Sequence, residues 1–145
     1  VDKMCAEGWV EVCLEMLQLR HDVLRKNAVM TLCNMSHSLP SSRTLRQTFS
    51  DSGVYEAVAG LINDDNEAIS YLAVELSCMA TSVGKRISTF DKGKTARQET
   101  MGLTAAIDDE TFMGMGWNIG ETGESIAAMC TDPEARSLLV EAGIV

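Results

Sequence analysis

The chain has 145 residues, 46% of them hydrophobic, which is enough for one domain with a substantial core. Its 21 acidic and 12 basic side chains give a net charge of −9, a field that repels phosphate backbones and argues against nucleic acid as a partner. No apolar run approaches the roughly 20 residues of a membrane-spanning helix, so we expect no membrane insertion. Two prolines, 5% aromatic residues and abundant Ala, Leu, Met and Glu predict an all-α fold.

The cysteines are odd in number, widely spaced and set among apolar residues. They are Cys5, Cys13, Cys33, Cys78 and Cys130. This usage indicates reduced thiols that act as small core side chains, so a cytoplasmic, reducing location is expected. The first residue, Val1, and the abrupt end of the sequence suggest a piece of a longer chain or of a multiprotein complex.

Glycines recur along the sequence at intervals of 40 to 50 residues. The four markers are Gly8, Gly53, Gly93 and Gly143. Each follows a short apolar anchor by three or four positions, which predicts one short helix before each glycine. Such a period is the signature of a repeat architecture.

A second helix is predicted after each of the first two glycines, over residues 9–18 and 54–63. Apolar side chains at steps of three and four give each helix one buried face. These are Val10, Cys13, Leu14 and Leu17 in the first, and Val54, Val58, Leu61 and Ile62 in the second. In the polar turns that follow, Asp22, Asp65 and Asn66 are suited to accept the unpaired amide hydrogens of the next helix.

Longer helices are predicted next, over residues 22–38 and 66–82, and they align from their ends. The matching apolar pairs are Ala28 with Leu72, Leu32 with Leu76, and Met35 with Met79, and Ile126 and Met129 fall into the same register. A unit of one short and two longer helices cannot bury this stripe alone. Successive units are therefore expected to stack into a continuous core.

The stretches "RKNAVMTLCNMSHS" and "ARSLLVEAGIV" resemble the third helix and the glycine junction of armadillo repeats. Two-helix repeats such as HEAT share the same packing logic. The resemblance implies a right-handed α-α superhelix, an armadillo-like solenoid of about three repeats plus the start of a fourth. The approximate units are residues 4–41, 42–82, 85–132 with an insertion near 108–123, and an incomplete 133–145.

The resemblance also implies that the third helices line a concave groove for an extended peptide or another protein's surface. Nuclear-import adaptors carry a tryptophan there, followed four residues later by an asparagine. Asn34 matches that asparagine, but Met30 stands at the tryptophan position, and the later units offer Val74 with Cys78 and Glu124 with Ala128. Because the tryptophans are missing, binding of nuclear-localisation signals is not expected.

Carried over position by position, the groove falls on residues from three units. They are Asn27, Met30, Asn34, His37, Tyr71, Val74, Cys78, Glu121 and Glu124. Asn34 could hold a peptide backbone by donating and accepting hydrogen bonds at once. The alternatives are a solvated helix face or, for Asn34, a local bond to its own helix backbone.

The third unit is about ten residues longer than the second and contains "GMGWNIGETG". Its glycines, Gly114, Gly116, Gly120 and Gly123, predict a loop or a broken helix, since each costs a helix about 1 kcal/mol relative to alanine. The stretch lacks the strand, lysine and hydroxyl of a phosphate-binding loop. Trp117 could anchor a partner or cap the core of its repeat.

The one dense basic stretch comprises Lys85, Arg86, Lys92, Lys94 and Arg97. It can be a solvated connector or can contact an acidic segment of a partner. Among these residues, Lys92, Lys94 and Arg97 are the predicted partner contacts.

Nothing in the residue pattern indicates an enzyme, a metal site or a cofactor. Cys33 and His37 lie four apart on one helical face, but a core thiol near a polar helix end explains them better than a catalytic dyad. Cys-x-x-Cys and His-x-x-x-His pairs are absent from the sequence. The predicted function is a protein-binding scaffold or adaptor. The alternatives are a structural subunit packed inside a large assembly and a segment of a myosin-directed chaperone.

Overall fold

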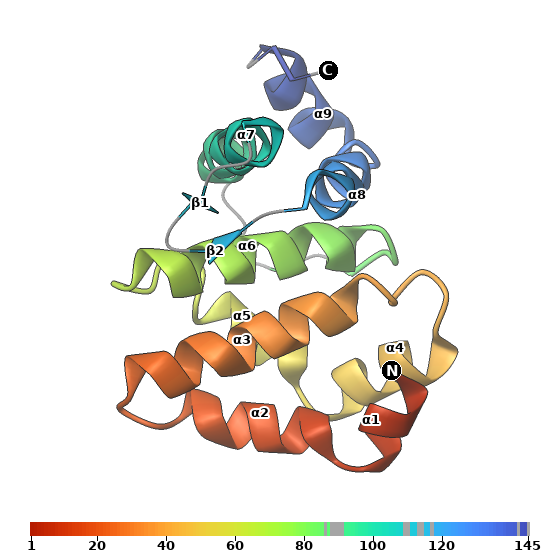
Figure 1. Ribbon diagram of the computed structural model, residues 1–145. Coiled ribbons are helices and arrows are strands. Elements are labelled where there is room, and N and C mark those ends of the chain that lie inside the picture. The colour runs from red at the N-terminus through yellow and green to blue at the C-terminus, as the bar shows by residue number, and fades with distance from the viewer. Residues whose placement is uncertain are drawn as a thin grey trace.

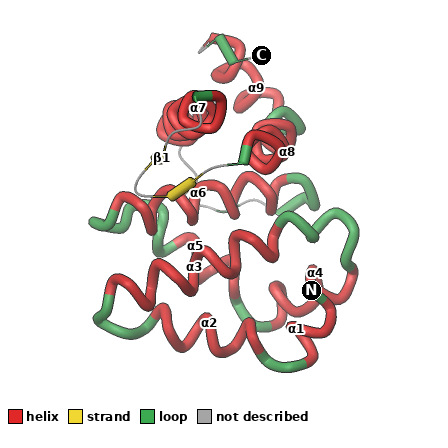
Figure 2. The backbone as a smooth tube through the Cα atoms, viewed as in Figure 1, coloured by secondary structure: helices red, strands yellow, loops and turns green. Residues whose placement is uncertain are grey.

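The computed structural model describes residues 1–85, 87, 92–108, 111–112, 115–116, 118–141 and 143–144. These residues form helices joined by short loops, together with one pair of two-residue strands (Figures 1 and 2). In chain order the elements are α1 (Asp2–Ala6), α2 (Trp9–Leu17), α3 (Asp22–Ser36), α4 (Arg43–Asp51), α5 (Val54–Ala59), α6 (Glu67–Thr81), α7 (Lys92–Ile107), β1 (Thr111–Phe112), β2 (Met115–Gly116), α8 (Ile119–Met129) and α9 (Pro133–Glu141). The predicted all-α class is confirmed.

The glycine junctions adopt a left-handed backbone, which explains why glycine recurs at them. Gly8 and Gly53 have φ of 76° and 74° and immediately precede α2 and α5, while Gly143, at 75°, follows α9. Only glycine adopts this conformation without a steric penalty from Cβ. The marker at Gly93 is wrong, because Gly93 is the second residue of α7. The short helix predicted before it falls largely on residues outside the described part of the chain.

The two longest predicted helices of the first units are observed almost as expected, and each contains 15 residues. Asn66 caps α6 by accepting hydrogen bonds from the amides of Ala68 and Ile69 at 3.1 and 3.3 Å. The cap of α3 is not Asp22, as predicted, but His21, whose Nδ1 accepts from the Leu24 amide at 3.4 Å. Asp22 pairs instead with Arg25 at 3.3 Å.

The last described residues of the insertion in the third unit are helical. Asn118 starts α8 by accepting from the amides of Gly120 and Glu121 at 2.8 and 3.3 Å. Gly120 and Gly123 therefore lie inside a helix, and the loop prediction is wrong for both. Upstream of α8, β1 and β2 pair antiparallel, with Thr111 opposite Gly116.

The helices pack in layers that follow the chain. Figure 1 shows α2, α3 and α6 one above the other, with α7 and α8 above α6 and α9 at the far end. Helices at equivalent places contact one another: α1 packs on α4, α2 on α5, and α3 on α6, while α8 packs on both α6 and α7. The aligned stripe forms the core, with exposures of 8% or less at Ala28, Leu32, Met35, Leu72, Leu76, Met79, Ile126 and Met129.

The contact between α6 and α7 is close at one glycine. A Cβ atom on Gly102 would collide with the hydroxyl of Tyr71, a side chain with no exposed surface. Glycine at this position of α7 thus permits the helix to lie directly over the middle of α6.

Candidate partner-binding site

The residues of the predicted groove that lie on α3 and α8 are here called the third-helix face. It comprises Asn27, Met30, Asn34 and His37 from the α3 region, and Glu121 and Glu124 from α8. Asn27, Asn34 and both glutamates are exposed, whereas Met30 and His37 are half-buried. Six of the predicted groove residues are therefore accessible on two helices.

An ionisable pair joins the two helices of this face. His37 follows α3, and its Nδ1 lies 3.1 Å from Oε2 of Glu124 on α8, 87 residues further along the chain. The two side chains border a hollow of about 460 Å³, which is also lined by Pro40, Met79 and Thr131. The first and third units thus meet at this edge of the molecule.

The middle unit does not contribute an open surface between them. Tyr71, Val74 and Cys78 on α6 each have 0% exposure. Helix α6 is in contact with α3, α5, α7 and α8, which cover it. A partner cannot reach these three side chains in this arrangement, so the groove assignment is wrong for them.

A buried carboxylate lies where the third helices converge. Glu75 on α6 is 2% exposed, and its Oε1 accepts a hydrogen bond from the Ser125 hydroxyl of α8 at 2.9 Å. Its Oε2 lies 3.8 Å from the Cys33 thiol of α3, which can donate to it. One side chain thereby joins α3, α6 and α8 beneath the third-helix face.

A second buried carboxylate, Glu99, comes from α7 and has no exposed surface. Its Oε1 lies 3.7 Å from the Cys78 thiol, while its Oε2 has no hydrogen-bond partner among the described residues. Burial, and then repulsion from Glu75, raises the pKa of Glu99 well above the ordinary glutamate value. Burial also raises the pKa of Glu75, an effect that the Ser125 hydroxyl opposes.

The buried thiols do not support covalent catalysis. Burial, followed by the charge of a neighbouring glutamate, raises the pKa values of Cys33 and Cys78. A thiol that remains protonated is a poor nucleophile. Cys33 also points to Glu75, while His37 pairs with Glu124, so the sequence pair Cys33 and His37 forms no dyad.

Neither a metal-binding cluster nor a membrane-spanning helix occurs in the part of the chain that the structure describes. Within the described ranges, no group of three or more His, Cys, Asp or Glu side chains could hold a metal ion. Each helix in those ranges is too short or too polar to cross a lipid bilayer.

The predicted basic contacts separate in space. The Lys94 ammonium donates to the Ile62 carbonyl at 2.6 Å and to the Ser70 hydroxyl at 2.8 Å, so it ties α7 to the start of α6. This structural role argues against Lys94 as a partner contact. Arg97 is exposed on α7. The side chain of Lys92 and all of Trp117 lie outside the described residues.

Sequence reasoning missed the two buried glutamates. The available signal was Glu75 itself, a lone acid within the apolar run "YLAVELSCMA". Glu99 gave no comparable signal, because it stands among polar residues of α7. Its burial depends on how α7 lies across α6.

Comparison with known proteins does not assign the chain to a family. No protein-family model matches the chain, and neither the curated proteins nor the solved structures gave a significant match. The likeness to armadillo repeats therefore rests on the residues that suggested it.

Proposed function

We propose that this chain is a segment of an armadillo-like solenoid that acts as a non-catalytic scaffold and binds an extended peptide or protein surface through the third-helix face. The packing of equivalent helices carries the proposal: α1 contacts α4, α2 contacts α5, and α3 contacts α6. Neighbour-to-neighbour packing of this kind is expected of stacked repeats. The five free cysteines support a reducing, cytoplasmic setting.

The chemistry of the third-helix face suits an extended backbone. The Asn34 amide is exposed and forms no hydrogen bond with any described residue, so both its donor and its acceptor are open to a partner. Asn27 is exposed two helical turns earlier on α3. Glu121 and Glu124 make the α8 side acidic, which favours a partner segment that is neutral or basic.

A second candidate function, a structural subunit of a larger assembly, is favoured by the ends of the layered stack. Large hydrophobic side chains that remain exposed in the described part of the chain come from its first elements and from α7 onward. They are Val1, Trp9, Val12, Leu19 and Val23 before α4, and Met101, Ile107, Ile119 and Val140 from α7 onward. Apolar surface at the ends of a repeat stack is normally covered by a cap or a neighbour.

Affinity capture with matched surface variants tests the scaffold. The double variant Asn34→Arg with Glu121→Arg changes the third-helix face, and Glu56→Arg introduces an arginine on the exposed side of α5 as a control. We expect proteins retained by the wild type and by the control to be lost from the double variant. Equal retention by all three chains would contradict binding at this face.

The same capture separates the structural alternative. The double variant Trp9→Ser with Met101→Ser removes one exposed apolar side chain from each end of the stack. Loss of the retained proteins from this variant alone would assign the interaction to the ends, as a structural subunit requires.

A further inference from the structure

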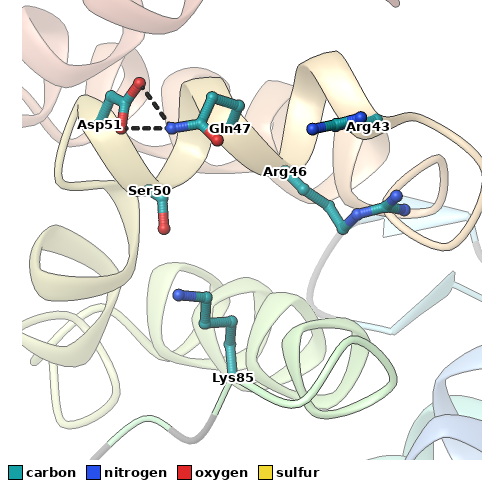
Figure 3. Close-up of a pocket in the computed structure, with 6 residues that line it drawn as sticks. All are labelled: Arg43, Arg46, Gln47, Ser50, Asp51 and Lys85. Carbon is teal, nitrogen blue, oxygen red and sulfur yellow. Dashed lines mark hydrogen bonds between the residues drawn. The ribbon is translucent and has the colours of Figure 1, made fainter.

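A basic cleft lies between α4 and the segment that follows α6. Arg43, Arg46, Gln47, Ser50 and Asp51 come from one side of α4, and Lys85 forms the opposite wall (Figure 3). The hollow measures about 460 Å³. In the sequence Lys85 begins a basic stretch that continues to Arg97. In the fold it lines the same hollow as Arg43 and Arg46, which lie about 40 residues earlier in the chain.

The cleft concentrates positive charge on an otherwise acidic protein. The lining of the cleft contains three cations, Arg43, Arg46 and Lys85, and one acid, Asp51, whereas the whole chain carries a net charge of −9. None of the three cations forms an ion pair with a residue that the structure describes. The Asp51 carboxylate accepts hydrogen bonds from the Gln47 amide at 2.8 and 3.0 Å.

Two of the cations are held in place by neutral groups. The Arg46 guanidinium donates to the carbonyls of Leu39 and Pro40 at 2.6 and 3.0 Å. The Lys85 ammonium lies 5.8 Å from the centre of the Tyr55 ring, within the range of a cation–π contact. These contacts orient the charges without neutralising them, so less side-chain freedom is lost when an anion binds.

We infer that this cleft binds a carboxylate-rich segment of a partner protein, with Arg43 and Lys85 as the contacts on its two walls. A guanidinium can form paired hydrogen bonds with a carboxylate, and an ammonium adds a point charge from the other side. Ser50, exposed on α4 and directed toward Lys85, offers a hydroxyl donor. Arg46 positions the cleft through its bonds to the loop after α3.

An acidic peptide fits this site better than a nucleic acid does. The cleft is short and its basic residues are few, whereas a nucleic-acid backbone would extend beyond it over the acidic remainder of the surface. The site shares no residue with the third-helix face. Its occupancy can therefore be tested independently of the proposed scaffold function.

The test measures binding of a fluorescent, end-blocked octaglutamate peptide to the full chain at low salt. Octaglutamine and octalysine serve as peptide controls, and a dT octanucleotide tests the nucleic-acid alternative. The cleft variant is Arg43→Ala with Lys85→Ala. The matched control is Arg20→Ala with Arg136→Ala, which removes the same charge from two other exposed sites. Thermal unfolding followed by circular dichroism verifies that both variants are folded.

We expect octaglutamate to bind the wild type and the control alike, and the cleft variant about tenfold more weakly, as the loss of two exposed charge contacts suggests. Amide NMR shifts on titration should centre on Arg43, Gln47 and Lys85. Equal weakening in both variants would show a nonspecific charge effect and overturn the proposal. Tighter binding of the dT octanucleotide, or absence of octaglutamate binding at low salt, would overturn it as well.

Discussion

Helices α3 and α6 occupy equivalent places in successive units, have the same length and share one apolar stripe, yet their surroundings differ. In α6, 13 of 15 residues are buried, compared with 6 of 15 in α3. Helix α6 is in contact with α3, α5, α7 and α8, whereas α3 is in contact mainly with α2 and α6. Position within the stack, as much as the repeated stripe, therefore determines which helix can present a surface.

The aligned residues of α3 and α6 differ in polarity, as their difference in burial leads one to expect. Asn27 and Asn34 on α3 correspond to Tyr71 and Cys78 on α6, so the polar outer positions become less polar in the middle unit. Less polar side chains at positions where the equivalent helix has polar, solvent-facing ones indicate that a further helix covers those positions. That neighbour is the pair α7 and α8.

The largest expected difference in stability is between variants at the aligned positions Tyr71 and Asn27. Tyr71→Ala should lower the free energy of unfolding by about 3–5 kcal/mol, because it leaves a cavity beneath α7. Asn27→Ala, at the equivalent exposed site, should change it by less than about 0.5 kcal/mol. Urea unfolding of both variants checks the difference. Similar losses in the two would mean that α3 is as enclosed as α6.

The burial of Glu99 on α7 predicts that the stability of the chain depends on pH. Since the pKa of Glu99 is raised above its ordinary 4.5 when the chain is folded, the folded state retains a proton that the unfolded state releases. Stability should therefore fall as the pH rises above about 4.5, and the loss should be complete once the pH exceeds the folded pKa.

Glu99→Gln removes the part of this dependence that is due to Glu99, and it should stabilise the chain at pH 7 by on the order of 1–3 kcal/mol. Glu141→Gln, which removes the same charge from an exposed site, is the control. Thermal melts between pH 4 and pH 8 measure both. A Glu99→Gln profile as steep as that of the wild type would show that Glu99 ionises freely in the folded chain.

The smallest expected difference in stability is between variants of the N-terminal caps of α6 and α3. Asn66→Ala removes two hydrogen bonds from the start of α6 and should cost about 1 kcal/mol. His21→Ala removes the single, longer bond at the start of α3 and should cost less. Urea unfolding of both variants measures the two losses of stability, and a larger loss for His21→Ala than for Asn66→Ala would contradict this expectation.

Much of the first two units was predictable because local chemistry decides it. Left-handed glycines, an asparagine cap and a period of three and four residues all act within one or two helical turns. The expected ranges 22–38 and 66–82 accordingly differ from α3 and α6 by at most two residues at either end.

The third unit was less predictable because its structure depends on contacts between distant residues. Gly93 has the spacing of a junction but lies within α7, and Gly120 and Gly123 lie in a helix that Asn118 caps. The burial of α6 and the grouping of Arg43 with Lys85 likewise follow from packing across units. Neither is encoded in a local pattern.

The rates at which the cysteine thiols react with an alkylating reagent report motion between these layers. Cys5 and Cys130 are partly accessible, whereas Cys33 and Cys78 are sealed between α6 and its neighbours. An alkylating reagent should therefore react promptly with the accessible pair, and with the buried pair only when α6 separates from its neighbours. The delay between the two events reports how often the molecule opens at its centre while its outer layers remain folded.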